Sequence, residues 1–557
     1  MPATASTGAN TTWHPERSRP STTATTITTL YRHHHRHRPP FSSGNIHTHR
    51  HRVINSALRL PIFPSVDLEG EDVVAQLPLQ QQQQEEDGVL IPPESSLQSL
   101  HQSTTAGRNT ETVFFAACLA TFMAAIGRAS FSVLSVPIQQ SYGLTLSQVG
   151  MAQSAMLLGY LIFQVRRTKG YIYISTTTTC LLNAITIEQI PTGLLADRVG
   201  GARALCAGLI AWSIALAALA TAPLATSPFT IILGARAALG AAQAVMMPGV
   251  SAAAAQFFPP SIRASKTSSV YAFYSLGTVM GLGSTPIIAR LTHSELVVPF
   301  LLFGGVGAVL GAMALRLLPN LPPSYIQRQY NPTTSNKTKT RKSIDRSMVV
   351  RNLPQILLLC WTHGVIGFGF FVLQAWVPIF LYSLGGSHSA TLDLATLGIL
   401  SALPWMFTAA IAALAGNAAD WLQSSAQWSP LRVRRCMQSV ASIGGALSFA
   451  PLALTSSATL SPLSATVALC MAVAAQGFYY GGFHAYVGDV ASQDAGVVLG
   501  MTNSFSIVAG IVGNVVAGAL AGQTGFQAVF GLAMVLHGVS AATWLIFARG
   551  RRIELRV

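Results

Sequence analysis

The sequence predicts an all-α integral membrane protein, with twelve transmembrane helices in two six-helix halves that follow a disordered N-terminal extension. Of the 557 residues, 50% are hydrophobic and only 10% are charged, whereas soluble proteins contain about 25% charged residues. Apolar runs long enough for a membrane helix, which needs roughly 20 residues, recur twelve times along the chain. Arginine and lysine residues collect in alternate connections between these runs, a pattern typical of multi-pass membrane proteins.

The apolar runs define the expected helices and their grouping. A basic loop at residues 320–350 separates an N-terminal half, residues 111–319, from a C-terminal half, residues 351–550. Residues 1–110 form the extension, and residues 551–557 form a C-terminal tail. The runs of the N-terminal half are 113–136, 147–164 (continued at 190–195), 202–221, 229–257, 267–290 and 297–318. The runs of the C-terminal half are 354–383, 392–419, 434–455, 460–487, 496–522 and 526–548.

The distribution of positive charge predicts the orientation of these helices. Connections after even-numbered runs are rich in arginine and lysine, and those after odd-numbered runs are nearly uncharged. Both termini are therefore expected on the same, basic side of the membrane. The net charge of +15 is a topology signal, and no nucleic-acid partner is expected, because nucleic-acid binding requires basic side chains gathered on one face. The hydrophobic pattern excludes a soluble enzyme, and the scattered cysteines predict neither a disulfide framework nor a metal site.

The N-terminal extension has the composition of an organelle transit peptide. Up to Val66 it contains eight arginines, no lysine and a single acid, Glu16, among many serines and threonines. A secretory signal would need an apolar core segment, which this stretch lacks. This composition is shared by plastid and mitochondrial transit peptides. Together with the resemblance described below, it leads us to expect a plastid membrane location, in the envelope or the thylakoid, with a mitochondrial or other endomembrane location as the alternative.

A matched motif marks the second run of each half. Gly193 and Asp197 form a GxxxD pattern, which Gly416 and Asp420 repeat in the second half. Between the second run and the first motif lies a block, Val165–Gln189. Its removal shortens the spacing from Val113 to Gly193 from 80 to 55 positions, nearer the 60 positions from Ile356 to Gly416 in the second half, and joins an uninterrupted helix, "GYLIFQIPTGLLADRVGG". Valine codons begin with GT and one glutamine codon is CAG, so the block has the boundaries of a phase-zero intron. Our hypothesis is a retained intron; a genuine loop insertion and an extra crossing at Tyr171–Ile187 are the alternatives.

Several stretches of this chain resemble the major facilitator superfamily. "GLLADRVGGARAL" (Gly193–Leu205) is similar to the superfamily loop between helices 2 and 3. The stretches Ala235–Val250, Gln256–Gly281, Phe368–Leu381 and Gly488–Gly513 more specifically resemble the anion:cation symporter family, which includes sodium/phosphate cotransporters, vesicular glutamate transporters and plastid phosphate and ascorbate transporters. The resemblance implies the major facilitator fold and a conformational-switch loop that contains Gly193, Asp197, Arg198 and Gly200, with Asp420 in the corresponding loop of the second half.

Two arginines within apolar runs are the candidate substrate-binding residues. An arginine at membrane depth costs roughly 2.5–3.5 kcal/mol on translocon scales, so it usually faces a cavity or a partner. Arg128 lies in the first run and Arg236 at the start of the fourth, and two guanidinium groups facing the midplane would bind an anion through paired hydrogen bonds. The resemblance implies the same role for both positions. The alternative is that each arginine reaches the membrane surface or braces a helix end.

The chain departs from the family pattern at several acidic positions. A glutamate that members of the family often have seven residues after the helix-4 arginine is replaced by Gln243, which cannot carry a proton. Gly127 stands where helix 1 of family members often has an aspartate. Asp489 remains as an acid near the expected site, and Asn503 is a further candidate for the cavity or for ion coupling. A structural role at a loop is the alternative for Asp489.

These observations predict a secondary transporter of a small anion that works by alternating access. Inorganic phosphate is the expected substrate, and ascorbate, glutamate or a uronate is the alternative. The loss of the helix-4 glutamate favours sodium coupling or exchange over proton coupling; no cofactor is expected besides the coupling ion, Na⁺ or H⁺. A non-transporting membrane sensor or inactive paralogue is the alternative from a different class. We expect a monomer in the lipid bilayer.

Overall fold

A computed structural model of the chain describes residues 94–164, 196, 199–259, 262–292, 297–320, 346–385, 392–492 and 494–555. Within these residues twelve helical segments are long and apolar enough to cross a membrane, which confirms the predicted number and the all-α fold. The predicted extra crossing, the insert Val165–Gln189 and most of the N-terminal extension lie outside the described residues.

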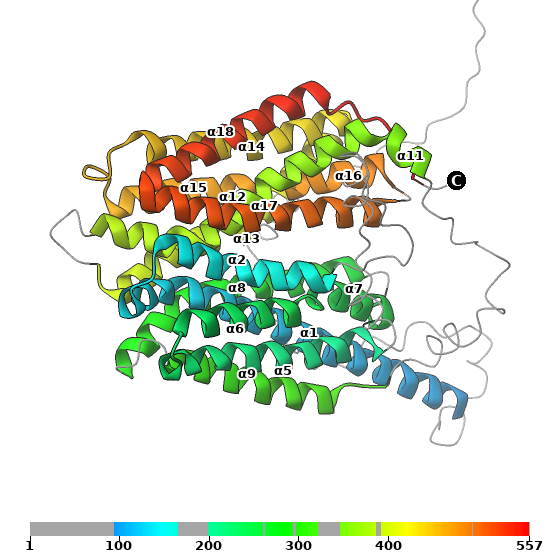
Figure 1. Cartoon of the computed structure of the whole chain (residues 1–557). Coiled ribbons are helices and arrows are strands. Elements are labelled where there is room, and N and C mark those ends of the chain that lie inside the picture. The colour runs from blue at the N-terminus through cyan, green and yellow to red at the C-terminus, as the bar shows by residue number, and fades with distance from the viewer. Residues whose placement is uncertain are drawn as a thin grey trace, which may run out of the picture. The chain divides into compact units, whose positions relative to one another are not determined.

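The N-terminal half supplies the first six spans (Figure 1). Two of them are built from two consecutive helical segments each: α5 with η3, and α6 with α7. The segments are α1 (Glu94–Tyr142), α2 (Leu146–Gln164), α5 (Gly201–Ala218), η3 (Leu219–Leu224), α6 (Pro228–Gln243), α7 (Met246–Phe257), α8 (Arg263–Leu291) and α9 (Val297–Leu317).

The C-terminal half supplies the other six spans. Its tenth span consists of α15, the π-helical turn η4 and α16. The segments are α11 (Arg346–Arg351), α12 (Leu353–Gly385), α13 (Leu394–Ser424), α14 (Pro430–Leu454), α15 (Pro462–Gly477), η4 (Tyr480–His484), α16 (Ala485–Val490), α17 (Ala495–Gln523) and α18 (Phe526–Phe547).

Local chemistry explains where several of these helices begin and end. The side chains of Asp393, Ser429 and Ser461 each accept a hydrogen bond from a backbone N–H in the first turn of the following helix, which satisfies a donor that the helix leaves unpaired. Gly143 and Gly525 have positive φ values of 60° and 87° in the tight turns after α1 and α17, a conformation that glycine adopts without strain.

The first helix differs from the prediction because it begins at Glu94, before the expected boundary at residue 110. The apolar run begins at Val113, but the helix starts before it, in a polar segment whose residues include two with partners on neighbouring helices. Glu111 forms an ion pair with Lys266 at 2.7 Å, and the Thr110 hydroxyl donates to the carbonyl of Phe257. The basic loop also differs, since its end forms the short helix α11.

Helix contacts within and between the halves position the centre of the molecule. Inside the halves α1 packs on α8 and α12 on α17, whereas α2–α17 and α8–α13 join one half to the other; Figure 1 shows α2 and α17 side by side. Gly150 allows the α2–α17 approach, because a Cβ there would lie 2.5 Å from the carbonyl oxygen of Asn514. The backbones of the two halves therefore meet at the level of Asn514.

Candidate functional site

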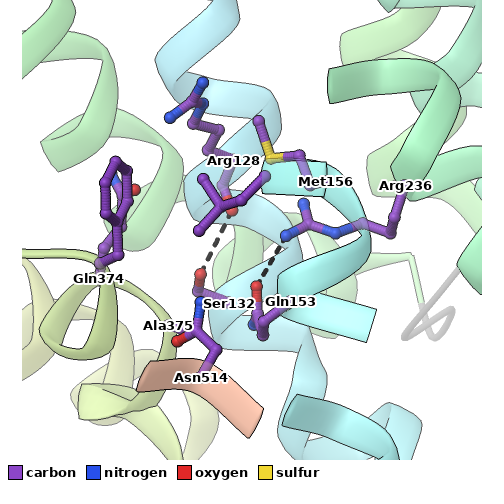
Figure 2. Close-up of a pocket in the computed structure, with 10 residues that line it drawn as sticks. Arg128, Ser132, Gln153, Met156, Arg236, Gln374, Ala375 and Asn514 are labelled. Carbon is purple, nitrogen blue, oxygen red and sulfur yellow. Dashed lines mark hydrogen bonds between the residues drawn. The ribbon is translucent and has the colours of Figure 1, made fainter. Parts of the chain in front are cut away.

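A small cavity of about 20 Å³ lies between the two halves (Figure 2). Helices α1, α2 and α6 of the N-terminal half and α12 and α17 of the C-terminal half contribute its walls. It is lined by Arg128, Ser132, Gln153, Met156, Leu157, Arg236, Phe371, Gln374, Ala375 and Asn514. This volume corresponds to about one water molecule, so a larger ligand requires the walls to move apart.

Arg128 on α1 lines this cavity and is oriented by Gln243. The Arg128 Nε donates a 2.8 Å hydrogen bond to Gln243 Oε1, and Gln243 Nε2 donates to the carbonyl oxygen of Ala124 at 3.1 Å. The guanidinium also lies over the ring of Tyr160, 5.5 Å from its centroid. Gln243 is fully buried and does not itself line the cavity. Its amide therefore fixes one edge of the guanidinium and leaves the two Nη atoms available.

Arg236 on α6 reaches the same cavity from another side. Its Nη2 donates to Gln153 Oε1 at 2.7 Å and its Nε to the carbonyl oxygen of Ala152 at 3.3 Å; Figure 2 shows the guanidinium directed toward Gln153. The Phe131 ring centroid lies 4.2 Å from the Arg236 Cζ, a cation–π distance. The remaining nitrogen, Nη1, is buried without a hydrogen-bond partner among the described residues.

The cavity is positively charged because neither arginine has an acidic partner in the part of the chain that the structure describes. The three ion pairs recorded there involve other residues, Lys266–Glu111, Arg290–Asp393 and Arg434–Asp489. Arg128 is 7% exposed and Arg236 is 2% exposed, so neither side chain extends to the surface. Two cations held this deep between apolar helices are costly without an anion.

Three amide side chains complete the polar lining and were not singled out by the sequence. Gln153 Nε2, Gln374 Nε2 and Asn514 Oδ1 are buried and have no hydrogen-bond partner within the described ranges. Amide oxygen and nitrogen positions are interchangeable by rotation, so Asn514 can also offer a donor. Polar amides within strongly apolar runs were the available signal for these residues.

Other sequence-predicted residues lie away from the cavity. Asp489 pairs with Arg434 at 2.9 Å and is partly exposed, which matches the structural alternative for this residue. Asn503 is half-buried on α17 and does not line the cavity. Gly200 caps the start of α5 with φ 98°, and Asp420 is exposed on α13. The remaining switch-loop residues, Gly193, Asp197 and Arg198, lie outside the described residues.

The polar contacts between the halves lie at the cavity or nearer the weakly charged side of the membrane. The Ser154 hydroxyl donates to the carbonyl of Ile511 at 2.8 Å, near the cavity. Toward the weakly charged side, Gln140 Nε2 donates to the Tyr382 hydroxyl at 2.9 Å. At the same end, Arg290 and Asp393 form an exposed 3.6 Å ion pair. Among the described residues no hydrogen bond or ion pair joins the halves on the basic side of the cavity.

Comparison with known proteins identifies a family and several plant relatives. The family model "Major Facilitator Superfamily" matches residues 171–513. The chain is 27% identical to "Probable anion transporter 4, chloroplastic" of Oryza sativa subsp. japonica over 432 residues, 76% of this chain and 66% of that protein. It is 27% identical to "Sodium-dependent phosphate transport protein 1, chloroplastic" of Arabidopsis thaliana over 444 residues, 78% of both chains. It is 25% identical to "Ascorbate transporter, chloroplastic" of the same plant over 441 residues, 78% of this chain and 74% of that protein.

Solved structures show the same fold at low sequence identity. A D-xylose–proton symporter superposes with a TM-score of 0.60 at 13% identity, covering 79% of this chain and 99% of that chain. A bacterial homologue of the human lysosomal transporter Spinster superposes with a TM-score of 0.59 at 16% identity, covering 79% and 97%. The chloroplast location in the names of the relatives agrees with the plastid membrane location predicted from the N-terminal extension and the family resemblance together. Because its family match spans more than half of the sequence and its twelve spans form two halves, the chain belongs to the major facilitator superfamily of membrane transporters.

Proposed function

We propose that this protein is a secondary transporter that carries inorganic phosphate across a plastid membrane by alternating access. The observation that carries the proposal is the cavity between the halves, where two buried guanidinium groups meet without an acidic partner among the described residues. The names of two relatives, a sodium-dependent phosphate transporter and an ascorbate transporter, support an anion as the substrate.

The unpaired polar atoms of the cavity favour a ligand rich in hydrogen-bond acceptors. Arg236 Nη1 and the amide nitrogens of Gln153 and Gln374 are donors without partners in the described part of the chain, and the Nη atoms of Arg128 extend beyond its bond to Gln243. A phosphate ion offers four oxygens, so it can accept from several directions at once, and guanidinium groups bind it in pairs. Buried donors without acceptors cost about 1–3 kcal/mol each, which a bound anion would remove.

The distribution of contacts between the halves supports a transport cycle. The recorded polar contacts close the cavity toward the weakly charged side, so access from the basic side requires fewer contacts to break. We infer that the two halves rock about the cavity, breaking the Gln140–Tyr382 and Arg290–Asp393 contacts when the opposite side opens. An anion bound in the cavity would neutralise the positive charge of the two arginines during this step.

The residue at position 243 supports a proposal about the coupling ion. Gln243 holds Arg128 through a neutral amide, and an amide cannot take up or release a proton. Proton coupling through this position is therefore excluded chemically, and we propose sodium coupling or exchange of one anion for another.

The test is uptake of radiolabelled phosphate into proteoliposomes that contain the purified protein. We expect uptake that a sodium gradient or internal phosphate stimulates and that an imposed pH gradient does not. Wild-type protein, Arg236→Gln and the surface control Arg432→Gln are compared; only Arg236→Gln should lose uptake. Both forms of the protein, with and without Val165–Gln189, are needed, because no phosphate flux from either correctly inserted form contradicts the proposal.

An organic anion is the second candidate substrate, and the ascorbate transporter among the relatives supports it. A carboxylate or enolate matches the same guanidinium pair. Competition of labelled phosphate uptake by ascorbate, glutamate and glucuronate separates the candidates. Stronger inhibition by one of these than by unlabelled phosphate assigns the site to that organic anion. Absence of flux for every anion would favour the non-transporting alternative.

A further inference from the structure

A second cavity, of about 450 Å³, lies at the basic-side end of the C-terminal half. It is formed by the first turns of α12, the last turns of α18 and the segment that follows α18, which Figure 1 shows running toward α11. The cavity is lined by Pro354, Gln355, Leu357, Leu358, Trp361, Thr543, Phe547, Arg549 and Arg551. It shares no residue with the cavity that contains Arg128 and Arg236, so the transport site does not account for it.

The lining of this second cavity changes from apolar to cationic along the membrane normal. Leu357, Trp361 and Phe547 are 37%, 38% and 55% exposed, and they form the apolar wall of the cavity. Arg549 and Arg551 follow α18 at the basic-side boundary. Trp361 lies seven residues beyond Pro354, about 10 Å deeper along α12. The depth corresponds to the distance from lipid headgroups to the first part of the acyl chains.

The backbone after α18 is fixed, so the two arginines have defined positions. The Gly550 N–H donates to the Tyr486 hydroxyl at 3.0 Å, and the Ile553 N–H donates to the carbonyl of Val490 at 2.7 Å. Leu555 N–H donates to the carboxylate of Asp494 at 2.8 Å. Ile553 and Leu555 are also buried. Arg549 and Arg551 therefore belong to an ordered segment that forms one side of the cavity.

Neither Arg549 nor Arg551 has an acidic partner within the described ranges, where the ion pairs involve other residues. One further polar group of the cavity lacks a partner there, since Gln355 Oε1 is buried and accepts no hydrogen bond. A ligand that satisfies all three groups carries a negative charge and a hydroxyl donor at one end and is apolar at the other. A free phosphate ion would leave the apolar wall exposed.

We propose that this cavity binds an anionic lipid with a hydroxyl-bearing headgroup, such as phosphatidylglycerol. The phosphate lies between Arg549 and Arg551, a headgroup hydroxyl donates to Gln355 Oε1, and one acyl chain packs on Leu357, Trp361 and Phe547. Basic pockets between transmembrane helices are known sites for anionic headgroups. The lipid ties the basic-side ends of α12 and α18 together.

The test measures lipid retention by native mass spectrometry of the purified full-length protein, titrated with phosphatidylglycerol or phosphatidylcholine. A basic residue near an anionic lipid headgroup contributes about a fivefold preference, so Arg549→Gln/Arg551→Gln should weaken phosphatidylglycerol binding about 25-fold and leave phosphatidylcholine unaffected. The matched control is Arg552→Gln, an exposed arginine of the same segment that does not line the cavity; it should bind as the wild type does. Equal phosphatidylglycerol binding by the double variant and by the control overturns the proposal.

Two further experiments test whether the bound anion is a lipid and whether its headgroup hydroxyl is recognised. Inorganic phosphate or glycerol 3-phosphate should not displace the lipid at concentrations that saturate a headgroup-only site, and displacement by either overturns the lipid assignment. Gln355→Leu should abolish the preference for phosphatidylglycerol over phosphatidic acid while keeping the preference for both over phosphatidylcholine. An unchanged preference in that variant overturns the role of the hydroxyl. Because binding is the readout, this result does not depend on whether the protein transports phosphate.

Discussion

Replacing Arg236 by lysine tests whether the guanidinium group binds the transported anion. The present side chain makes hydrogen bonds to Gln153 and to the Ala152 carbonyl, stacks on Phe131, and keeps Nη1 unpaired. A lysine ammonium keeps the charge, but its three donors diverge from one nitrogen and cannot form the planar pair with which a guanidinium binds two oxygens of an anion. Loss of one charge-assisted hydrogen bond, about 1.5–3 kcal/mol, predicts a KM for phosphate about 10- to 150-fold higher.

The assay is the initial rate of phosphate uptake into proteoliposomes over a range of phosphate concentrations. Arg432→Lys is the matched control, because Arg432 also lies over an aromatic ring, Trp428, but on an exposed surface of α14. The control should keep the wild-type KM, and thermal unfolding of each purified variant reports whether Arg236 only braces the helices. A KM for Arg236→Lys within about twofold of the wild type would refute the bidentate anion site.

Three further predictions concern the surroundings of the site. Gln243→Glu places a carboxylate against Arg128; we expect weaker phosphate uptake at neutral pH and recovery as the pH falls and protonation removes that charge, and a flat pH profile would contradict this. Gly240→Ala should prevent α6 from packing on α2, because a Cβ there would lie 1.8 Å from a backbone oxygen of α2. The control is Gly234→Ala on the same helix, where a Cβ meets nothing within 4 Å. Equal thermal stability of the two variants would contradict this prediction. Deletion of Val165–Gln189 should give a protein that folds and transports, and cDNA sequencing shows whether transcripts encode the block. The intron hypothesis would be refuted if every transcript encoded the block and uptake required it.

The fold could be predicted from the sequence because membrane spans depend on a local property. Each span needs a long apolar run whatever its neighbours are, so the runs gave the twelve helices that the structure contains. The predicted start of α1 was too late in the chain. Thr110 and Glu111 are polar, and their partners, Phe257 and Lys266, come from distant parts of the chain. Hydropathy describes where a helix is buried in lipid and carries no information on how far it continues beyond it.

The site could be predicted only in part, because it depends on which helix faces meet. Arg128 and Arg236 were identifiable as charges inside apolar runs, and both line one cavity. Asn503 and Asn514 lie on the same face of α17, eleven residues apart, so they differ by about 16 Å in depth. Only Asn514 lies at the level of the arginines, and the depth of the site is set by packing between the halves.

The amide of Gln243 gives the site a property that an acid at the same position would not. A carboxylate that accepts from Arg128 Nε would neutralise half of the positive charge of the cavity, so the anion would bind most strongly when that carboxyl is protonated. With Gln243 in its place, the residue that accepts from Arg128 adds no negative charge to the cavity. No proton bound at position 243 can then change the charge of the cavity, which agrees with the proposed coupling to a sodium gradient or to exchange with an anion on the opposite side. The same hydrogen bond that orients Arg128 is therefore made by a residue that cannot carry a coupled proton.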